Sequence, residues 1–229
     1  MIPVFIIARD RFTSLRNMTE SLDKIPEAKV VIVDNASTYP PLLNWYKTCP
    51  YEVFRLRTNI GRTSVNLYID DYDSDYYVIS DPDMDLEGVP VDMLDFLRNG
   101  LENHPDVCKT GLGIRIDDIP EKFPFREKVI KHESRFWMNR RDDQWWNGGI
   151  DSTFAMYRRG VECPYDPALR GNYPYVCRHT SWYLDFDNLP DDERYYLTYL
   201  KGSLSTWSGN ERCCAGIFRR GRPPEVIEA

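Results

Sequence analysis

The stretch Tyr76-Tyr77-Val78-Ile79-Ser80-Asp81-Pro82-Asp83-Met84-Asp85 joins an apolar run to three carboxylates at alternate positions. Aromatic and β-branched residues followed by turn formers predict a buried strand, and Pro82 ends it because proline lacks a backbone donor. Ligands of open α/β sheets bind beyond the carboxyl ends of the strands. Carboxylates crowded there repel one another unless a positive charge lies among them. A divalent cation with oxygen ligands would supply that charge.

An acidic turn and an EF-hand are the two other interpretations of this stretch. The aspartates also suit an acidic turn that caps a helix beginning near Pro90, since aspartate is a common turn and cap residue. An EF-hand is excluded, because loops counted from Asp71 or Asp81 lack glycine at the sixth position and glutamate at the twelfth.

Composition bounds the class of protein. The chain has 229 residues, of which 42% are hydrophobic and 28% charged, as expected of a globular protein. Its net charge of −7 predicts no general affinity for nucleic acid or anionic lipid. No apolar run is long enough to span a membrane, and residues 1–8 lack the basic region of a signal sequence. We therefore expect a cytoplasmic protein without a membrane span.

The six cysteines include no Cys-x-x-Cys pair, which argues against a structural zinc site. In a reducing compartment, buried free thiols are the expected state of such scattered cysteines.

Strands alternate with helices over the first hundred residues. We expect strands over residues 3–8, 29–33, 52–56, 77–79 and 107–116, and helices over residues 15–22, 40–46, 65–69, 90–103 and 191–200. Thr13 or Ser14 is predicted to cap the first helix. This alternation predicts an α/β fold with a mostly parallel central sheet flanked by helices.

The polar turns after the predicted strands, at Arg9, Asp34, Asn59 and Asp81, then meet at one edge of the sheet, as in a nucleotide site. Neither a Gly-x-Gly-x-x-Gly motif nor a Walker lysine loop is present. Residues 117–229 are rich in aromatic side chains, and no linker or repeat divides the chain. We predict one domain over residues 1–229, with a nucleotide-sugar-binding half (1–116) and an acceptor-side half (117–229). Residues 219–229 are predicted to lie loosely on the surface.

Three stretches carry a family resemblance: VVIVDNAS at residues 30–37, NIGRTSVN at 59–66 and VISDPDMD at 78–85. In this order they resemble nucleotide-sugar-dependent glycosyltransferases of the GT-A fold, specifically family-two-like enzymes with an Asp-x-Asp motif. The resemblance covers about the first ninety residues. It implies a nucleoside-diphosphate sugar donor, with a UDP-sugar favoured, a glycan or glycoconjugate acceptor, and Mn²⁺ or Mg²⁺ as cofactor.

The resemblance also assigns roles in metal binding. Residues 81–85 contain two overlapping Asp-x-Asp frames, and we favour Asp83 and Asp85 as metal ligands, with Asp81 facing the ribose or the sugar. His179 resembles the C-terminal histidine that completes the metal shell in some GT-A enzymes. A structural histidine is the alternative at that position.

Donor binding is predicted for a second group of residues. Asp34 would accept from the base or the ribose, or else act as a turn residue bonded to its own backbone. Asn59 lies in the turn that the family places after the third strand. Arg9 and Arg62 would donate to the phosphates. For Arg11 a solvated surface charge is the stronger expectation.

Residues 145–157 suit the acceptor side of a sugar site. Trp146 is predicted to bind the nucleotide sugar by stacking on a sugar face, and the alternative for both Trp145 and Trp146 is core packing. Asp151 precedes an apolar strand and is the candidate base that takes the acceptor's hydroxyl proton in an inverting transfer. Asp142 and Asp143 are rivals, although nearby arginines suggest a salt-linked turn.

The sequence therefore favours a metal-dependent glycosyltransferase of the hexosyltransferase type. A sugar nucleotidyltransferase is the enzymatic alternative, but it would usually carry a glycine-rich basic loop after the first strand. A carbohydrate- or calcium-binding module is the non-catalytic alternative, and the alternating helices argue against it.

Overall fold

The computed structural model describes residues 1–199 of the chain. The strands are β1 (Ile2–Ala8), β2 (Ala28–Asp34), β3 (Glu52–Arg55), β4 (Tyr76–Ser80), β5 (Met84–Asp85), β6 (Lys109–Gly111), β7 (Gly113–Ile114), β8 (Trp145–Asn147), β9 (Ala155–Arg158), β10 (Ala168–Gly171) and β11 (Val176–His179). The α-helices are α1 (Phe12–Leu22), α2 (Pro40–Trp45), α3 (Met93–Asn103), α4 (Arg126–Glu133) and α5 (Asp191–Tyr199). The 3₁₀ helices are η1 (Gly61–Leu67), η2 (Ile69–Asp71), η3 (Ser134–Trp137) and η4 (Thr180–Trp182).

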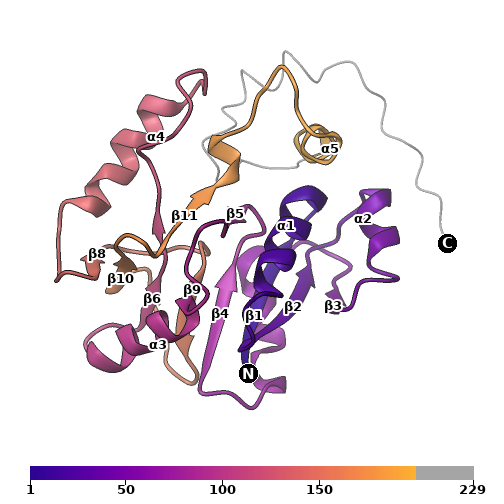
Figure 1. The fold of residues 1–229 in the computed structure, drawn as a ribbon. Coiled ribbons are helices and arrows are strands. Elements are labelled where there is room, and N and C mark those ends of the chain that lie inside the picture. Colours follow the sequence, from indigo (N-terminus) through magenta and orange to yellow (C-terminus); the bar gives the residue numbers. More distant parts are fainter. Residues whose placement is uncertain (200–229) are drawn as a thin grey trace.

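Within residues 1–199 the central sheet has eight strands in the order β3-β2-β1-β4-β9-β6-β10-β8. The strands run parallel except β8 and β9, which are antiparallel to their neighbours. A smaller sheet joins β5, β11 and β7. Figure 1 shows α4 and α5 above the carboxyl ends of the central strands, with β5 and β11 between them. The predicted α/β fold with a mostly parallel sheet is confirmed.

The first strand explains how the sheet is covered on both faces. Val4 and Ile6 point to one face and pack in the core that includes Leu15 of α1. Phe5 points to the other face and packs with Val65 of η1. Because side chains alternate along a strand, a continuous apolar run is required where both faces are buried. The sheet therefore holds its carboxyl edge in place between two packed layers.

Several predicted boundaries differ from the structure. The helix expected at residues 65–69 consists of the two 3₁₀ segments η1 and η2, and α3 begins at Met93 rather than at residue 90. The strand expected at residues 107–116 is divided between the two sheets as β6 and β7. Gly113 permits this crossing, because a Cβ there would lie 2.3 Å from the carbonyl oxygen of Gly171. Leu200 lies outside the described residues.

The predicted caps of α1 were wrong, because α1 begins before them, at Phe12. Asp192 of α5 instead accepts hydrogen bonds from the backbone N–H of Thr13, at 2.6 Å, and from its hydroxyl, at 3.0 Å. A carboxylate at a helix N-terminus satisfies an otherwise unpaired N–H group and interacts favourably with the helix dipole. This contact fastens α5 to the start of α1.

The expectation of free thiols was wrong for Cys108 and Cys163, which form a disulfide with a sequence separation of 55 residues. The bridge ties the chain just before β6 to the loop between β9 and β10. Cys49 and Cys177 are free, and Cys213 and Cys214 lie outside the described residues.

The predicted loose segment at residues 219–229 also lies beyond the described part of the chain. Among the helices of residues 1–199, none has the length and apolar character needed to cross a membrane.

The disulfide is expected to stabilise the fold. Replacing both Cys108 and Cys163 by serine should lower the free energy of unfolding by about 2–4 kcal/mol, because the bridge restricts the unfolded chain. Urea denaturation of the double variant measures this, and Cys49→Ser is the control that should leave stability nearly unchanged. A non-reducing peptide map without a 108–163 cross-link would contradict the pairing.

Candidate active site

A pocket of about 320 Å³ lies between the carboxyl edge of the sheet and α4. Its lining residues are Asp81, Ile114, His132, Glu133, Arg135, Asp151, Thr153, Tyr165, Arg170, His179 and Trp182. Three of the residues that the sequence singled out, Asp81, Asp151 and His179, therefore meet in one cavity although they come from distant segments.

Asp81 follows the end of β4 and is bound to the segment that carries Asp151. Its backbone N–H donates to the carbonyl oxygen of Ser152 at 2.7 Å, and its carboxylate accepts from the Ser152 hydroxyl at 2.7 Å. Burial raises the pKa of Asp81, and the neighbouring charge of Asp83 raises it further. Asp81 is therefore placed to act as a hydrogen-bonding group at the pocket wall.

Asp83 lies behind Asp81 and is buried, with 1% of its surface exposed. Its carboxylate forms an ion pair with Arg11 and accepts from the Ser181 hydroxyl at 2.6 Å. Burial alone would raise the pKa of Asp83, but His179 and Arg11 lower it. The carboxylate is thus held ionised inside the protein.

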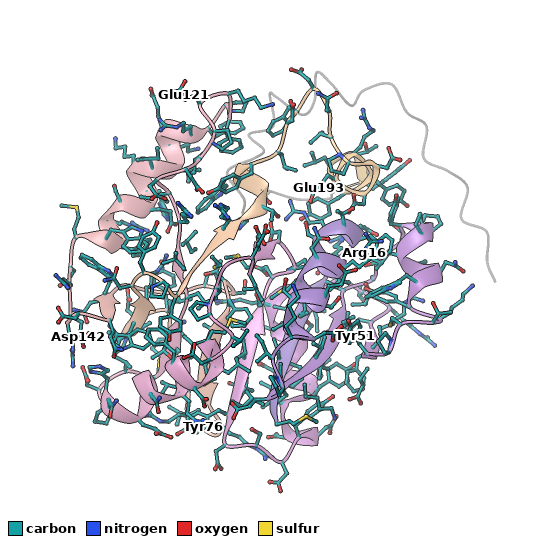
Figure 2. All side chains as sticks on the ribbon, viewed as in Figure 1. Arg16, Tyr51, Tyr76, Glu121, Asp142 and Glu193 are labelled. Carbon is teal, nitrogen blue, oxygen red and sulfur yellow. A yellow bond between two sulfur atoms is a disulfide. The ribbon has the colours of Figure 1, made fainter. Side chains whose placement is uncertain are left out.

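The expectation that Arg11 is a solvated surface charge was wrong. Its guanidinium is buried, forms the ion pair with Asp83, and lies 3.1 Å from a carboxylate oxygen of Glu193. It also lies 4.3 Å from the ring centroid of Tyr196. Glu193 and Tyr196 belong to α5, where Figure 2 labels Glu193. A buried charge needs such partners, and they come from segments that the local sequence does not connect with Arg11.

Glu193 is itself buried, and burial raises its pKa to about 7. The first turn of α5 is acidic, which suits the helix dipole. It serves in addition as a lid over the Arg11–Asp83 pair, with Asp192 fastened to α1 and Glu193 facing Arg11.

One carboxylate and one imidazole nitrogen lie together at this edge of the sheet. The Nδ1 atom of His179 is buried without a hydrogen-bond partner and lies 3.5 Å from a carboxylate oxygen of Asp83. As they stand, residues 1–199 contain no group of three or more histidine, cysteine or acidic side chains that could hold a metal. Mg²⁺ usually takes only one or two protein carboxylates and completes its shell with substrate phosphates and water. Asp83 would supply one carboxylate to such a shell, and Nδ1 of His179 one nitrogen ligand.

Asp85 does not line the pocket shared by Asp81, Asp151 and His179. It lines a different pocket of about 390 Å³, whose walls come from α1 and residues 84–93. Its carboxylate accepts from the backbone N–H of Glu87 at 2.9 Å, which is a local turn bond. Asp81 therefore faces the pocket while Asp83 lies behind it, and a metal role for Asp85 stays a prediction.

Arg62 and Asp151 reach toward one another across the site, with Arg62 Nη1 3.4 Å from Asp151 Oδ1. Both side chains are more than half exposed, so this ion pair contributes little to stability. Asn59 is exposed, and its side chain accepts from the N–H of Gly61 at 2.9 Å. Arg9 is half-buried at the end of β1. The binding roles of these three donor-side residues stay predictions.

Asp34 is fully buried at the end of β2. One carboxylate oxygen accepts from the Tyr46 hydroxyl at 3.2 Å, and the other accepts from Arg55 and from the N–H of Ser37, each at 3.3 Å. The turn role is therefore present in the structure, and contact with a nucleoside stays a prediction.

The two indoles of β8 point to opposite sides. Trp145 is buried and stacks on Phe96, with ring centroids 4.2 Å apart. Trp146 is half-buried, and its ring centroid lies 5.8 Å from that of Trp137. Neither indole lines the 320 Å³ pocket. Stacking of Trp146 on a sugar therefore stays a prediction.

The rival bases lie in a turn of their own, as expected. Asp142 accepts from the N–H groups of Gln144 and Trp145, and Asp143 pairs with Arg140 at 2.8 Å. Figure 2 shows Asp142 at the edge of the molecule, far from Glu193 in that view.

Sequence reasoning missed several residues of the pocket. Arg170 and Glu133 form a buried ion pair at 2.9 Å, and Tyr165 lines the same cavity. His132 also lines the pocket and is half-buried. Their partners lie tens of residues away, so no local motif marks them.

The fold resembles those of nucleotide-sugar-dependent glycosyltransferases and of nucleotidyltransferases. Glucosyl-3-phosphoglycerate synthase from Mycobacterium tuberculosis matches with a TM-score of 0.42 and 11% identity, over 69% of this chain and 57% of that one. The 4-diphosphocytidyl-2C-methyl-D-erythritol synthase from Anaerococcus prevotii matches with a TM-score of 0.42 and 8% identity, over 77% of this chain and 89% of that one. A galactosyltransferase, LgtC, matches with a TM-score of 0.34 and 11% identity, over 69% and 58% of the two chains.

The chain thus spans little more than half the length of the two glycosyltransferase chains, 57% and 58%. The mycobacterial synthase has also been solved with Mn²⁺ and uridine-diphosphate-glucose. No protein-family model matches the chain, and no curated protein matches it either. These likenesses concern the fold alone, so we derive the function from the residues of this chain.

Substitutions of Asp83 and of Asp85 are expected to differ sharply in their effect on the stability of the protein. Asp83→Asn should lower the free energy of unfolding by about 3–5 kcal/mol, because it removes one of the two carboxylates that pair with the buried charge of Arg11. Asp85→Asn is the matched control and should change stability by less than about 1 kcal/mol, since surface substitutions rarely do more. Equal urea midpoints for the two variants would contradict the buried pair.

Proposed function

We propose that this protein is a metal-dependent glycosyltransferase. It transfers a sugar, of the hexosyl type, from a nucleoside-diphosphate sugar to a hydroxyl group of a glycan or glycoconjugate. A UDP-sugar is the favoured donor, and the transfer inverts the anomeric centre with Asp151 as base. The observation that carries the proposal is the meeting of Asp81, Asp151 and His179 in one pocket at the carboxyl edge of the sheet.

The electrostatics of the pocket support a phosphorylated donor with a cation. A sugar nucleotide brings about two negative charges to a pocket that is lined by Asp151 and has the ionised Asp83 behind its wall. Like charges a few ångströms apart repel by several kcal/mol at an effective dielectric near 20. Asp83 and His179 are the residues that would hold Mn²⁺ or Mg²⁺. When bound, the cation would neutralise the diphosphate and stabilise the charge of the leaving group.

The residues of the chain supply the remaining steps. Arg62 turns from its exposed contact with Asp151 toward the phosphates, which frees the Asp151 carboxylate. Asp151 takes the proton of the acceptor hydroxyl as its oxygen attacks the anomeric carbon, and the bond from that carbon to the diphosphate oxygen breaks. Asp81, fixed by Ser152, accepts a hydrogen bond from the sugar or the ribose. Base catalysis of this kind contributes about 10²–10⁴ in rate.

The link between β1 and α1 argues against a nucleotidyltransferase. Residues 9–11 contain no glycine, and two of their three charged side chains, those of Asp10 and Arg11, are engaged within the protein. Asp10 accepts from the N–H groups of Thr38 and Tyr39, and Arg11 points to Asp83. This short link offers no loop that wraps a triphosphate.

Donor binding should depend on metal and on His179. Calorimetry is expected to show UDP binding in the presence of Mn²⁺ and none in EDTA, and His179→Ala should abolish the metal-dependent part. His104→Ala is the control, because His104 also lies near an aspartate, at 3.3 Å from Asp142, but away from the pocket. UDP binding of equal strength in EDTA would contradict the metal assignment. Binding of free sugar without nucleotide would favour a carbohydrate-binding module instead.

Asp151→Asn should lower the turnover number by about 10²–10⁴, because the acceptor loses its base, with UDP affinity unchanged. The measurement is hydrolysis of the UDP-sugar that a donor screen identifies, followed by NMR of the product anomer. Asp143→Asn, which removes an exposed carboxylate outside the pocket, should turn over normally. Undiminished turnover of Asp151→Asn with intact donor affinity, or a retained anomer, would refute the base assignment.

A further inference from the structure

The turn that carries Asp151 is held by a buried lysine. The ammonium group of Lys109 in β6 donates to the carbonyl oxygen of Ile150 at 2.5 Å, and only 3% of the residue is exposed. Burial lowers the pKa of Lys109 to about 8. Within residues 1–199 no carboxylate lies within ion-pair distance of this ammonium group. Removing this ammonium group from water is unfavourable. The hydrogen bond that offsets the desolvation goes to the carbonyl oxygen of Ile150, directly before Asp151.

A buried arginine holds the preceding carbonyl. Arg170 in β10 donates to the carbonyl oxygen of Gly149 from Nε at 3.0 Å and from Nη2 at 2.6 Å. Its third nitrogen donates to Glu133 at 2.9 Å, and its guanidinium lies 3.8 Å from the ring centroid of Phe136. The guanidinium is thus fixed in the plane that both acceptors require.

The surrounding backbone leaves the turn little freedom. The N–H of Ile150 donates to the carbonyl oxygen of Tyr165 at 3.3 Å, and the Ser152 carbonyl accepts from Asp81. The ring of Tyr165 packs directly on Gly149, where an added Cβ would lie 2.0 Å from it. The side chain of Asp151, in contrast, is 60% exposed. Its backbone is fixed while its carboxylate is open to the cleft.

We infer that Lys109 and Arg170 are positioning residues, which clamp the carbonyls of Ile150 and Gly149 and so set where the Asp151 carboxylate stands. This role rests on the proposed function, in which Asp151 is the base. A base must lie within hydrogen-bond reach of the proton that it takes, and a displacement of about 1 Å can cost 10²-fold in rate. Neither cation touches the reacting atoms through this contact.

Lys109→Met tests the clamp, because methionine keeps much of the side-chain volume but neither donates nor carries charge. We expect the turnover number to fall about 10²-fold, with UDP affinity unchanged. The double variant with Asp151→Asn should be no slower than Asp151→Asn alone, because both changes act through one carboxylate. If Lys109 only stabilised the fold, Lys109→Met would lower the turnover number of the parental protein and of Asp151→Asn by the same factor. That result would overturn the proposal.

Hydrogen exchange separates this inference from the proposed function. In Lys109→Met the peptide covering residues 148–153 should exchange faster, whatever the reaction. Unchanged protection refutes the clamp. Faster exchange combined with normal turnover of Asp151→Asn keeps the clamp and refutes Asp151 as base.

Another lysine and another arginine of the chain provide control substitutions for Lys109 and Arg170. Lys29→Met removes a lysine of β2, four strands away from β6 in the central sheet, whose ammonium group lies 4.5 Å from the Tyr72 ring centroid. Arg158→Met removes an arginine that also donates to two carbonyls, those of Val107 and Leu101, outside the pocket. Both should keep the parental turnover number.

Arg170→Lys covers the case in which Lys109→Met does not fold. It retains the cation and one donor but cannot hold Gly149 and Glu133 together. We expect an intermediate fall in turnover and faster exchange over residues 148–153. Parental values of both would refute the role of Arg170.

Discussion

The buried pair of Arg11 and Asp83 is the interaction on which the architecture of the site depends. It joins the link after β1 to the chain after β4, and the hydroxyl of Ser181 and the carboxylate of Glu193 complete it. A charge removed from water must find its partners inside the protein, or the fold loses several kcal/mol. The site can therefore form only when four distant segments, α5 among them, have come together.

The same constraint separates three aspartates that look equivalent in the sequence. Asp83 turns inward to Arg11, which leaves Asp81 as the acid at the wall of the pocket, while Asp85 faces another cavity. The crowding of carboxylates at a strand end was apparent from residues 76–85, and so was the need for a positive charge among them. Part of that charge is Arg11 itself. The unpartnered nitrogen of His179 lies beside Asp83, where we propose that a metal ion binds.

The local sequence pattern predicted those features of the fold that depend on interactions between residues close in the sequence. The apolar runs of β1, β2 and β4 and the polar turns after them gave the sheet and its functional edge, because burial on both faces demands such runs. The burial of Arg11, the pairing of Cys108 with Cys163 and the cap that Asp192 places on α1 could not be predicted, because each depends on a partner 55 or more residues away. The division of residues 107–116 between two sheets depends likewise on the close approach of Gly171 to Gly113.

In the transfer that we propose, the exposed and the fixed parts of the site have separate roles. Arg62 is exposed and held only by a weak surface ion pair, so it can move to an incoming phosphate at little cost. The backbone that carries Asp151 is fixed by buried cations, a packed tyrosine ring and the bond to Asp81, so the carboxylate keeps its place when Arg62 leaves. An exposed carboxylate on a fixed backbone is accessible to an acceptor and needs no rearrangement to receive its proton. That combination requires donors buried beneath the turn, and Lys109 and Arg170 are those donors.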